Sequence, residues 1–396
     1  MAEWIECKIS DIGTVVGGAT PSTKKIENYE GGNIAWITPK DLSTLSGRYI
    51  QCGERNITEI GLKGCSTQLL PKNTVLFSSR APIGYVAIAA NEVCTNQGFK
   101  SVIPNEATDP LFLFYLLKYN KNKIEAMGSG TTFKEVSGNT MKNIIVRVPS
   151  DKEVQKNIAS ILGTLDDKIE ENERINNNLL EQVLSIYRHR FIDTANELRQ
   201  TCRADEYFDI SIGKTPPRKE LQWFSTNPKD VTWVSISDMG TCGLYISESS
   251  EQLTREAVDR HNVKIVPDNT ILLSFKLTVG RIAITNGKMS TNEAIAHFKT
   301  DKKEINEYLY CYLKYFNYQT MGSTSSIATA VNSKIIKSMP FVIPTDDEIN
   351  EFHSLAAPMF AKIKANQSEI SNLTVLRDTL LPKLMSGEFD ISDMDI

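Results

Sequence analysis

The chain has 396 residues, of which 41% are hydrophobic and 23% charged, and a formal net charge of −4 at pH 7. This length suggests two or three domains with sizeable cores. The start of the chain lacks the basic and apolar segments of an export signal, and the apolar stretch near 111–117 is too short to span a bilayer. Seven cysteines without a CxxC spacing indicate reduced thiols in a cytoplasmic protein.

The charge alternates along the chain. Residues 1–150 hold 16 basic and 13 acidic side chains, and residues 201–344 hold 17 and 15. Residues 151–200 hold 7 basic and 10 acidic side chains, and residues 345–396 hold 4 and 10. Two mildly basic regions therefore alternate with two acidic segments. Affinity for phosphate depends on local basic patches and not on the net charge of the chain, so the net charge of −4 does not exclude a nucleic-acid partner.

Residues 1–150 predict an α+β domain with a mainly antiparallel sheet. Short β-rich runs alternate with turn signals, as in the strand of Trp36, the strand at 74–77 and the strand at 85–89. An apolar run at 110–119 predicts one helix.

Over residues 151–200 the spacing of the apolar residues changes and predicts a long helix. Apolar side chains at steps of seven form a seam with one polar member, as expected for a helix that pairs with another helix. The predicted seam consists of Ile158, Leu165, Asn172, Leu179 and Ile186.

The second half of the chain repeats the first. Trp36 returns as Trp233 at an offset of 197, and Gly84 returns as Gly280 at 196. A helix at 307–315 matches the one at 110–119. A period this long is that of a domain and not of a solenoid repeat.

A second seam follows at an offset of 194, again with one Asn among apolar residues. It consists of Phe352, Met359, Asn366, Leu373 and Leu380. Helices of about 35–40 residues would be roughly 50–60 Å long. Pro358 and Pro382 are expected to interrupt or kink the second helix. A helix packed on its own domain, with the Asn facing water, remains the alternative.

No catalytic or metal-binding constellation is found in the sequence. Four scattered histidines lack paired spacing. The run Ile212–Thr215 resembles the end of a phosphate loop, but Phe208 occupies the place of its first glycine. We therefore predict no catalytic residue, no metal site and no bound cofactor.

The chain resembles the DNA-specificity (S) subunits of type I restriction-modification enzymes over almost its whole length. The motifs that carry the resemblance are 36–41 (WITPKD), 78–84 (SSRAPIG), 95–98 (TNQG) and 380–388 (LLPKLMSGE). Their order, their duplication and the two acidic heptad segments make the combination specific.

The resemblance implies two target-recognition domains (1–150 and 201–344), a central spacer helix (151–200), a C-terminal spacer helix (345–388) and an acidic tail (389–396). It further implies that the helices pair antiparallel and that each domain reads one half of an asymmetric, interrupted site in double-stranded DNA. Two methyltransferase (M) subunits would carry S-adenosylmethionine and methylate adenine. Two restriction (R) subunits with ATP and Mg could join them. No membrane contact is implied.

Basic side chains in turns and in the divergent segments are the candidates for DNA contact. Arg80 aligns with Lys276 just ahead of the paired glycines, so a cation is expected on one turn in both copies. The second turn lacks the Ala-Pro pair of the first, and we expect a different backbone path there. The other candidates are Lys40, Arg48, Lys63, Arg218, Lys219, Arg255 and Arg260.

Tryptophan and asparagine side chains are also possible contacts. Trp36 and Trp233 are expected in the core because their flanks are β-rich, although they could stack on a base. Asn96 and Asn292 are expected to cap turns, although they could read adenine.

Two rival functions remain open from the sequence. One is a tandem ligand-binding or adhesion module that dimerises through a coiled-coil stalk. The other is an enzyme with unrecognised chemistry that uses Asp41 or Asp238. Under the S-subunit interpretation, a half-chain covering 1–200 should self-associate and, with M, modify a palindromic site.

Overall fold

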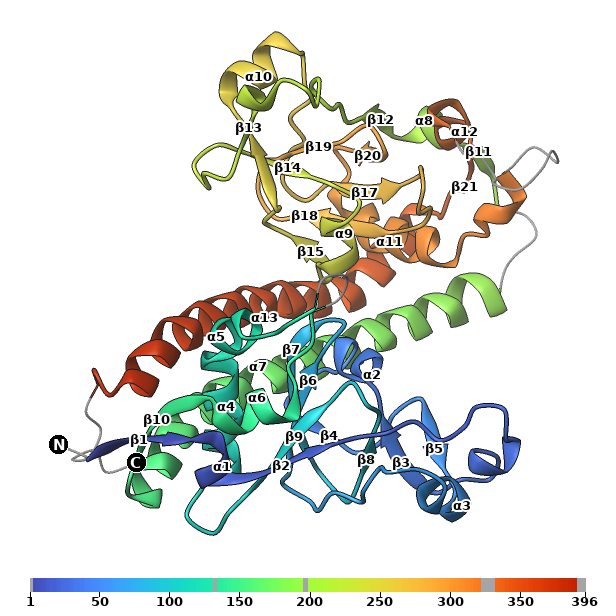
Figure 1. Ribbon diagram of the computed structural model, residues 1–396. Coiled ribbons are helices and arrows are strands. Elements are labelled where there is room, and N and C mark those ends of the chain that lie inside the picture. The colour runs from blue at the N-terminus through green and yellow to red at the C-terminus, as the bar shows by residue number, and fades with distance from the viewer. Residues whose placement is uncertain (1–2, 131–133, 195–198, 322–331, 390–396) are drawn as a thin grey trace. The chain divides into compact units, whose positions relative to one another are not determined.

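The structure is a computed structural model that describes residues 3–130, 134–194, 199–321 and 332–389 (Figure 1). It divides into unit 1, with residues 1–171 and 370–396, and unit 2, with residues 172–369. The expected acidic tail lies, except for Phe389, outside the described residues. The domain boundaries given above follow the repeat and remain a prediction.

Unit 1 is built on a five-stranded sheet, a three-stranded sheet and a strand pair. Its strands are β1 (Trp4–Lys8), β2 (Gly13–Gly17), β3 (Ile34–Ile37), β4 (Tyr49–Ile50), β5 (Arg55–Ile57), β6 (Val75–Ser79), β7 (Ile83–Ala89), β8 (Cys94–Thr95), β9 (Lys100–Pro104) and β10 (Ile145–Pro149). The orders are β2-β9-β6-β7-β4, β5-β3-β8 and β1-β10. All of these pairs are antiparallel except β4–β7 and β3–β8.

Short helices connect the strands of unit 1 (Figure 1). They are α1 (Ile9–Ile12), η1 (Ile26–Asn28), α2 (Pro39–Ser43), α3 (Glu59–Lys63), α4 (Pro110–Tyr119), α5 (Lys121–Ala126) and α6 (Gly138–Asn143). The helix predicted at 110–119 is confirmed as α4, where Pro110 occupies the first turn and Asp109 caps the amide of Phe112.

Both faces of the five-stranded sheet are buried. Successive residues of a strand point to opposite faces. Val75 and Phe77 pack in one core cluster with α4, whereas Leu76 packs in a second cluster with Ile37 of the three-stranded sheet. Unit 1 therefore stacks α4, the larger sheet and the smaller sheet in layers.

Unit 2 repeats this topology. Its strands are β11 (Thr201–Arg203), β12 (Asp209–Ile212), β13 (Phe224–Ser225), β14 (Val231–Val234), β15 (Tyr245–Ile246), β16 (Glu251–Leu253), β17 (Ile271–Ser274), β18 (Ile282–Thr285), β19 (Ser290–Thr291), β20 (Ile295–Lys299) and β21 (Pro340–Val342). The five-stranded order β12-β20-β17-β18-β15 matches that of unit 1 strand by strand. The second sheet, β13-β16-β14-β19, has one strand more, and β11 pairs with β21.

The helices of unit 2 also match, with α11 in the place of α4. They are α8 (Ala204–Tyr207), η3 (Leu221–Trp223), α9 (Asp238–Thr241), α10 (Arg255–Arg260), η4 (Lys303–Ile305), α11 (Asn306–Tyr315), η5 (Tyr318–Met321) and α12 (Ser333–Lys337). The duplication predicted from the sequence is therefore a duplication of the fold.

Two long helices each contribute to both units. Helix α7 (Lys152–Tyr187) has 36 residues and continues into a π-helical turn, η2 (Arg188–Asp193). Helix α13 (Asp346–Ser386) has 41 residues. These lengths confirm the 35–40 residues expected from the heptad pattern.

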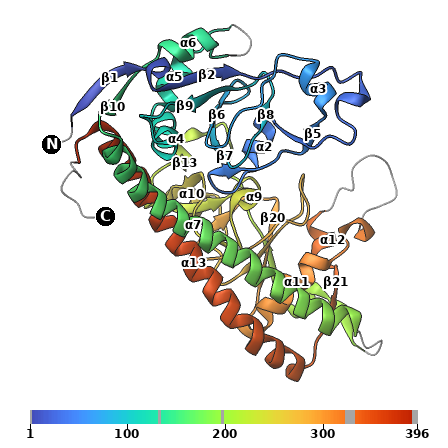
Figure 2. The same ribbon diagram turned by 90° about the horizontal axis from the view of Figure 1, so that it is seen from below.

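The helices pair antiparallel, as expected. Within unit 2, Asn172 Nδ2 lies 3.0 Å from Glu369 Oε2, and Arg190 Nη1 lies 2.9 Å from Glu351 Oε2. Residues further along α7 thus meet residues earlier in α13. Within each unit, the segments of the two helices lie side by side, as Figure 2 shows.

Helix α13 continues through Pro358 and Pro382. The expectation that these prolines interrupt the helix was therefore wrong. A proline removes one backbone hydrogen bond from a helix. Buried neighbours such as Ala356, Phe360 and Leu384 hold the flanking turns in place by packing.

The predicted seam residues lie on the covered side of the helices. Ile158, Asn172, Phe352 and Asn366 are buried. The remaining seam residues are half-buried, namely Leu165, Leu179, Ile186, Met359, Leu373 and Leu380. The buried face is wider than one seam, because Leu162 and Phe360 are also buried in core clusters shared with the sheets.

Candidate functional site

Four turns of unit 1 contact one another at one side of its sheets. We call them the polar edge of unit 1, and its counterpart the polar edge of unit 2. In unit 1 the edge comprises 18–22, 38–41, 79–84 and 95–98. In unit 2 it comprises 213–217, 235–238, 275–280 and 291–294.

The loop after β2 is anchored to this edge by a glycine and a tryptophan. A Cβ atom on Gly18 would lie 2.2 Å from the carbonyl oxygen of Asn96, so only glycine permits this approach. Trp36 Nε1 donates to the carbonyl oxygen of Ala19 over 3.1 Å, and the Thr20 hydroxyl donates to Gln97. Trp36 is only 6% exposed, which confirms it as a core residue.

Unit 2 repeats the anchor. A Cβ atom on Gly213 would lie 2.1 Å from the carbonyl oxygen of Asn292. Trp233, 1% exposed, donates from Nε1 to the carbonyl oxygen of Lys214 over 3.1 Å, and Thr215 donates to Glu293. The run Ile212–Thr215 therefore carries its glycine for close backbone packing and not to cradle a phosphate.

The two duplicated aspartates cap backbone turns. Asp41 accepts hydrogen bonds from the amides of Thr38 at 2.7 Å and Glu54 at 2.8 Å. Asp238 accepts from the amide of Ser235 at 2.8 Å and also from its hydroxyl. Burial alone would raise the pKa of Asp238, but hydrogen bonds from Ser235 and Ser250 outweigh it and hold that pKa below its usual value.

Asp238→Ala is expected to lower the stability of unit 2 by about 1–2 kcal/mol, because backbone amides lose their acceptor. Asp238→Asn, which keeps an acceptor oxygen, should cost less. Urea unfolding together with hydrogen exchange of β14 and β16 would measure both. A loss of turnover with unchanged stability would instead support the enzyme alternative.

Asn96 and Asn292 cap the third turn in each unit. Asn96 Oδ1 accepts from the amide of Gly98 at 2.8 Å, and Asn292 Oδ1 accepts from the amide of Ala294 at 3.1 Å. Their predicted capping role is confirmed.

Arg80 lies on the turn between β6 and β7. Ser78 braces this turn, since its hydroxyl donates to the carbonyl oxygen of Pro82 over 2.8 Å and accepts from the amide of Tyr85 at 2.8 Å. The Arg80 guanidinium is half-exposed and lies 3.4 Å from Glu135 Oε2. This long, partly exposed ion pair contributes little to stability.

Lys276 lies on the equivalent turn between β17 and β18, and it is exposed. Ser274 braces this turn as Ser78 does, by donating to the carbonyl oxygen of Thr278 over 2.6 Å. Ala81 and Leu277 follow the two cations with φ of 50° and 61°. The turns thus share their brace and their left-handed residue. Their backbone paths still differ, as expected, because the Ala81–Pro82 peptide bond is cis and the Leu277–Thr278 bond is not.

Arg218 and Lys276 converge on Glu293 at the polar edge of unit 2. Burial by itself raises the pKa of Glu293, but the hydrogen bond from Thr215 and the charges of Lys276 and Arg218 lower it below its usual value. The structure therefore brings together two predicted contact residues that lie 58 positions apart in the sequence.

Arg218 is held in place by aromatic rings. Its guanidinium carbon lies 4.4 Å from the ring centre of Phe224 and 4.6 Å from that of Trp233. Its Nη1 lies 2.8 Å from Glu251 Oε2. A stacked, half-exposed guanidinium of this kind loses little further side-chain entropy when it binds a ligand.

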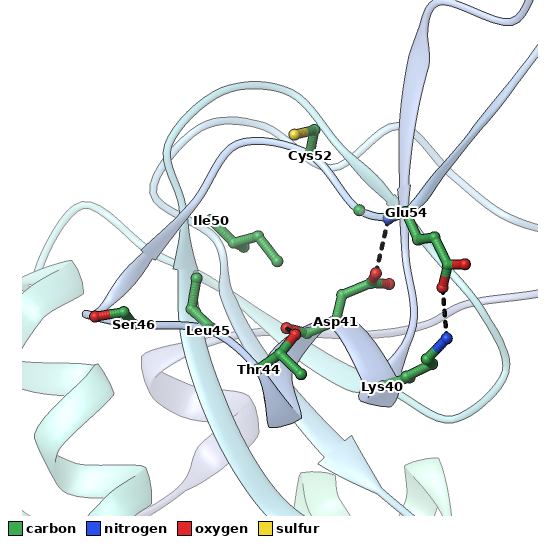
Figure 3. Close-up of a pocket in the computed structure, with 9 residues that line it drawn as sticks. Lys40, Asp41, Thr44, Leu45, Ser46, Ile50, Cys52 and Glu54 are labelled. Carbon is green, nitrogen blue, oxygen red and sulfur yellow. Dashed lines mark hydrogen bonds and ion pairs between the residues drawn. The ribbon is translucent and has the colours of Figure 1, made fainter. Parts of the chain in front are cut away.

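Lys40 lines a cavity of about 420 Å³ in unit 1 (Figure 3). Its Nζ lies 2.7 Å from Glu54 Oε2, and Asp41 reaches the backbone of the same residue. Figure 3 shows Cys52 and Ile50 on the other walls of this cavity. The exposed Lys40–Glu54 pair is of the weak surface kind.

Arg48 lies away from the polar edge and is only 5% exposed. Its Nε donates to Glu170 Oε1 over 3.0 Å, its Nη1 donates to the carbonyl oxygen of Gly163 over 3.2 Å, and its Nη2 pairs with Asp167. All three partners belong to α7. In the structure this arginine joins β4 to the helix, and its donors do not face solvent.

The remaining candidates are exposed but are not brought into the polar edges by the contacts of the described residues. Lys63 pairs with Glu59 at 3.1 Å within α3, and Arg260 lies 5.2 Å over the ring of Trp223 in unit 2. Arg255 begins α10, and Lys219 follows Arg218 in its loop.

The described residues contain no group of three or more His, Cys, Asp or Glu side chains that could hold a metal ion. Within the same ranges, every helix is too short or too polar to cross a membrane.

The chain is thus a duplicated α+β protein in which each unit carries a matching polar edge and a segment of both long helices. Residues 1–181 and 197–368 match the type I restriction modification DNA specificity domain. The chain belongs to this family, the specificity subunits of type I restriction-modification enzymes.

Relatives match over the full length. The chain is 35% identical to the type I restriction enzyme MjaIX specificity subunit of Methanocaldococcus jannaschii, over 99% of this chain and 95% of that one. It is 23% identical to the HindI specificity subunit of Haemophilus influenzae, over 98% and 100%. The crystal structure of an S subunit from M. genitalium shares the fold, with a TM-score of 0.61, 18% identity and coverage of 97% and 96%.

Proposed function

We propose that this chain reads an asymmetric, two-part site in double-stranded DNA, with the polar edge of each unit directed at one half-site. The observation that carries the proposal is the duplicated turn that presents Arg80 in unit 1 and Lys276 in unit 2 beside equivalent braces. The scaffold of the edge is shared, whereas the side chains around it differ. Two such edges can recognise two unlike sequences.

The chemistry of the edges fits this role. Exposed cations on turns bind phosphates and position a protein on the duplex, whereas polar side chains on the same loops read the edges of bases. Arg218, stacked and exposed, has the donor geometry for a guanine or a phosphate. In a protein of this kind the half-sites should lie about one duplex turn apart, roughly 34 Å, or a multiple of it.

The helices would serve as the docking surface for two M subunits, which two R subunits can join. Helix α13 exposes apolar side chains that a partner could cover, with Val375 64% exposed and Leu376 45% exposed. S-adenosylmethionine would then be bound by the M subunits, and ATP with Mg by the R subunits. This chain would supply specificity and no catalytic group.

Removal of one turn cation is expected to weaken binding through one half-site only. With the full chain in complex with its M subunit, Arg80→Ala should lose affinity for DNA that keeps the first half-site, and Lys276→Ala for DNA that keeps the second. For each variant, a plot of log K for DNA association against log salt concentration should be less steep, by about 1 unit of slope. The measurement is fluorescence anisotropy at several salt concentrations, on duplexes with either half scrambled.

Matched controls lie at the other ends of the same hairpins. Lys72 and Lys288 are exposed lysines outside the polar edges, and their replacement by alanine should leave binding and salt slope unchanged. If Arg80→Ala lost the same affinity on both scrambled duplexes, the assignment of one polar edge to each half-site would be contradicted. Binding that is insensitive to salt would favour the ligand-binding alternative.

A further inference from the structure

A buried carboxylate of α7 joins three elements of unit 1. Asp166 is 4% exposed. Its Oδ2 accepts from the Tyr115 hydroxyl of α4 over 2.6 Å, and its Oδ1 accepts from Arg377 Nη1 of α13 over 2.7 Å. The Arg377 side chain is 17% exposed and also pairs with Asp378 at 2.8 Å. Both carboxylate oxygens are therefore satisfied away from water.

Unit 2 has an apolar cluster in the same place. The helices are related by an offset of 194, which makes Phe360 the counterpart of Asp166 and Val183 the counterpart of Arg377. The offset of 196 makes Cys311 the counterpart of Tyr115. Phe360 is 1% exposed, Val183 and Cys311 are fully buried, and all three belong to one core cluster.

Arg48 extends the same contrast. Its counterpart at an offset of 196 is Leu244, which is 5% exposed and lies in the apolar cluster of unit 2. At these positions the join between sheets and helices is thus charged and hydrogen-bonded in unit 1 but apolar in unit 2. Elsewhere in unit 2, α13 makes polar contacts, through His353 to Glu307 and through Gln367 to the backbone of Tyr245.

This contrast decides which helix each repeat can pair with. If α7 paired with a second copy of α7, Val183 would stand where Arg377 stands, and Asp166 would keep only Tyr115. If α13 paired with a second α13, Arg377 would face Phe360 in an apolar core. Removing one partner of a buried ion pair disfavours a state by a factor on the order of 10² or more. The pairing of α7 with a second α7 and that of α13 with a second α13 are therefore less stable than the pairing of α7 with α13. We call the first two homologous pairs.

We propose that Asp166–Arg377 and Phe360–Val183 are a matched pair of determinants that make the first repeat select the second repeat and reject another copy of itself. Opposed attractive and repulsive contacts of this kind are how paired helices achieve specificity. The determinants keep two different recognition regions together. The repeat alone led us to expect that a half-chain covering 1–200 self-associates. Because this half-chain lacks Arg377, we now expect it to self-associate only weakly.

The test uses the full chain with a protease site inserted within 195–198 and cut after folding. Native mass spectrometry then reports, after equilibration, whether fragment 1 pairs with fragment 2 or with a second fragment 1. The wild-type protein should give the mixed pair, with homologous pairs below about 1%. The double variant Asp166→Phe/Arg377→Val gives unit 1 the apolar pair that unit 2 carries at these two positions. It should move the mixture towards the statistical one-quarter, one-half, one-quarter distribution.

A second variant keeps the proposal testable if the double variant does not fold. Val183→Arg gives a second α7 the missing cation for Asp166 and places a charge beside Phe360. It should raise the homologous pair of fragment 1 at least tenfold. Leu162→Ala, a buried change in the same core of unit 1, is the control and should destabilise without changing the partners. Homologous pairs in the wild type, or their absence in both designed variants, would overturn the proposal.

Discussion

Arg48→Ala is expected to lower the stability of unit 1 by about 2–3 kcal/mol and to leave the salt dependence of DNA binding unchanged. The guanidinium is buried and donates to a helix carbonyl and two carboxylates, and the alanine would remove these side-chain donors. Glu170 would keep the hydrogen bond from the backbone amide at position 48. Breaking a fully buried pair costs about 3–5 kcal/mol. The effect here should be smaller, because the side chain of Glu170 is 31% exposed and that of Asp167 71% exposed.

Urea unfolding with hydrogen exchange of β4 and α7 would measure this effect. Arg48→Leu is the informative companion, since it installs the residue that unit 2 carries at the same place. It should not restore stability, because Glu170 remains opposite the new leucine while unit 2 has Lys364 there. If Arg48→Ala keeps full stability but lowers the salt slope by about 1, then Arg48 binds DNA phosphate after all.

His297 should make unit 2 sensitive to mild acid. The ring is fully buried in β20, where Nδ1 lies 3.0 Å from the Ser211 hydroxyl and Nε2 lies 2.7 Å from that of Thr291. Burial, and secondarily the charge of Lys299, lower the pKa of His297 to about 3. In the unfolded chain this pKa would be about 6.5.

The sign follows from proton linkage. Between these two pKa values the unfolded chain binds a proton that the folded chain does not, so acid favours unfolding. The contribution of His297 is complete above about pH 7 and declines as the pH falls towards 3. From about pH 7.5 to pH 5 the loss should be about 2 kcal/mol.

Unit 1 supplies an internal control. The counterpart of His297 is Ser101, which is also buried but does not titrate. Hydrogen exchange at pH 7.5 and pH 5 should therefore show loss of protection in β20 and not in β9. In the variant His297→Gln the loss in β20 should disappear. The same loss in wild type and variant would mean that another group causes it.

The sequence predicted the elements whose signals are local. Helix α4 begins and ends where the apolar run and its proline place it. The duplication could be predicted because Trp36 and Trp233 lie at similar sequence distances from the turns that they contact. Such features depend on residues that are near one another in the chain.

Contacts that span the chain were not predictable in this way. Asp166 meets Arg377 across 211 positions, and within a heptad pattern a lone Asp looks like a solvated residue. Arg48 was a candidate for DNA because it is a cation in a divergent loop, and only the fold shows that α7 covers it. The assignment of the other cations to bases or phosphates stays a prediction, because it depends on a duplex that meets them.

The composition of the two units bears on how the chain folds during its synthesis. Unit 1 takes residues 152–171 from α7, yet the helix segment that covers them begins at residue 370. The first sheets can form on a ribosome long before their partner segment exists, with Asp166 still lacking its arginine. A chain terminated early would retain this open, charged surface. Most of unit 1 is synthesised first, yet unit 1 can finish folding only after α13 has been synthesised.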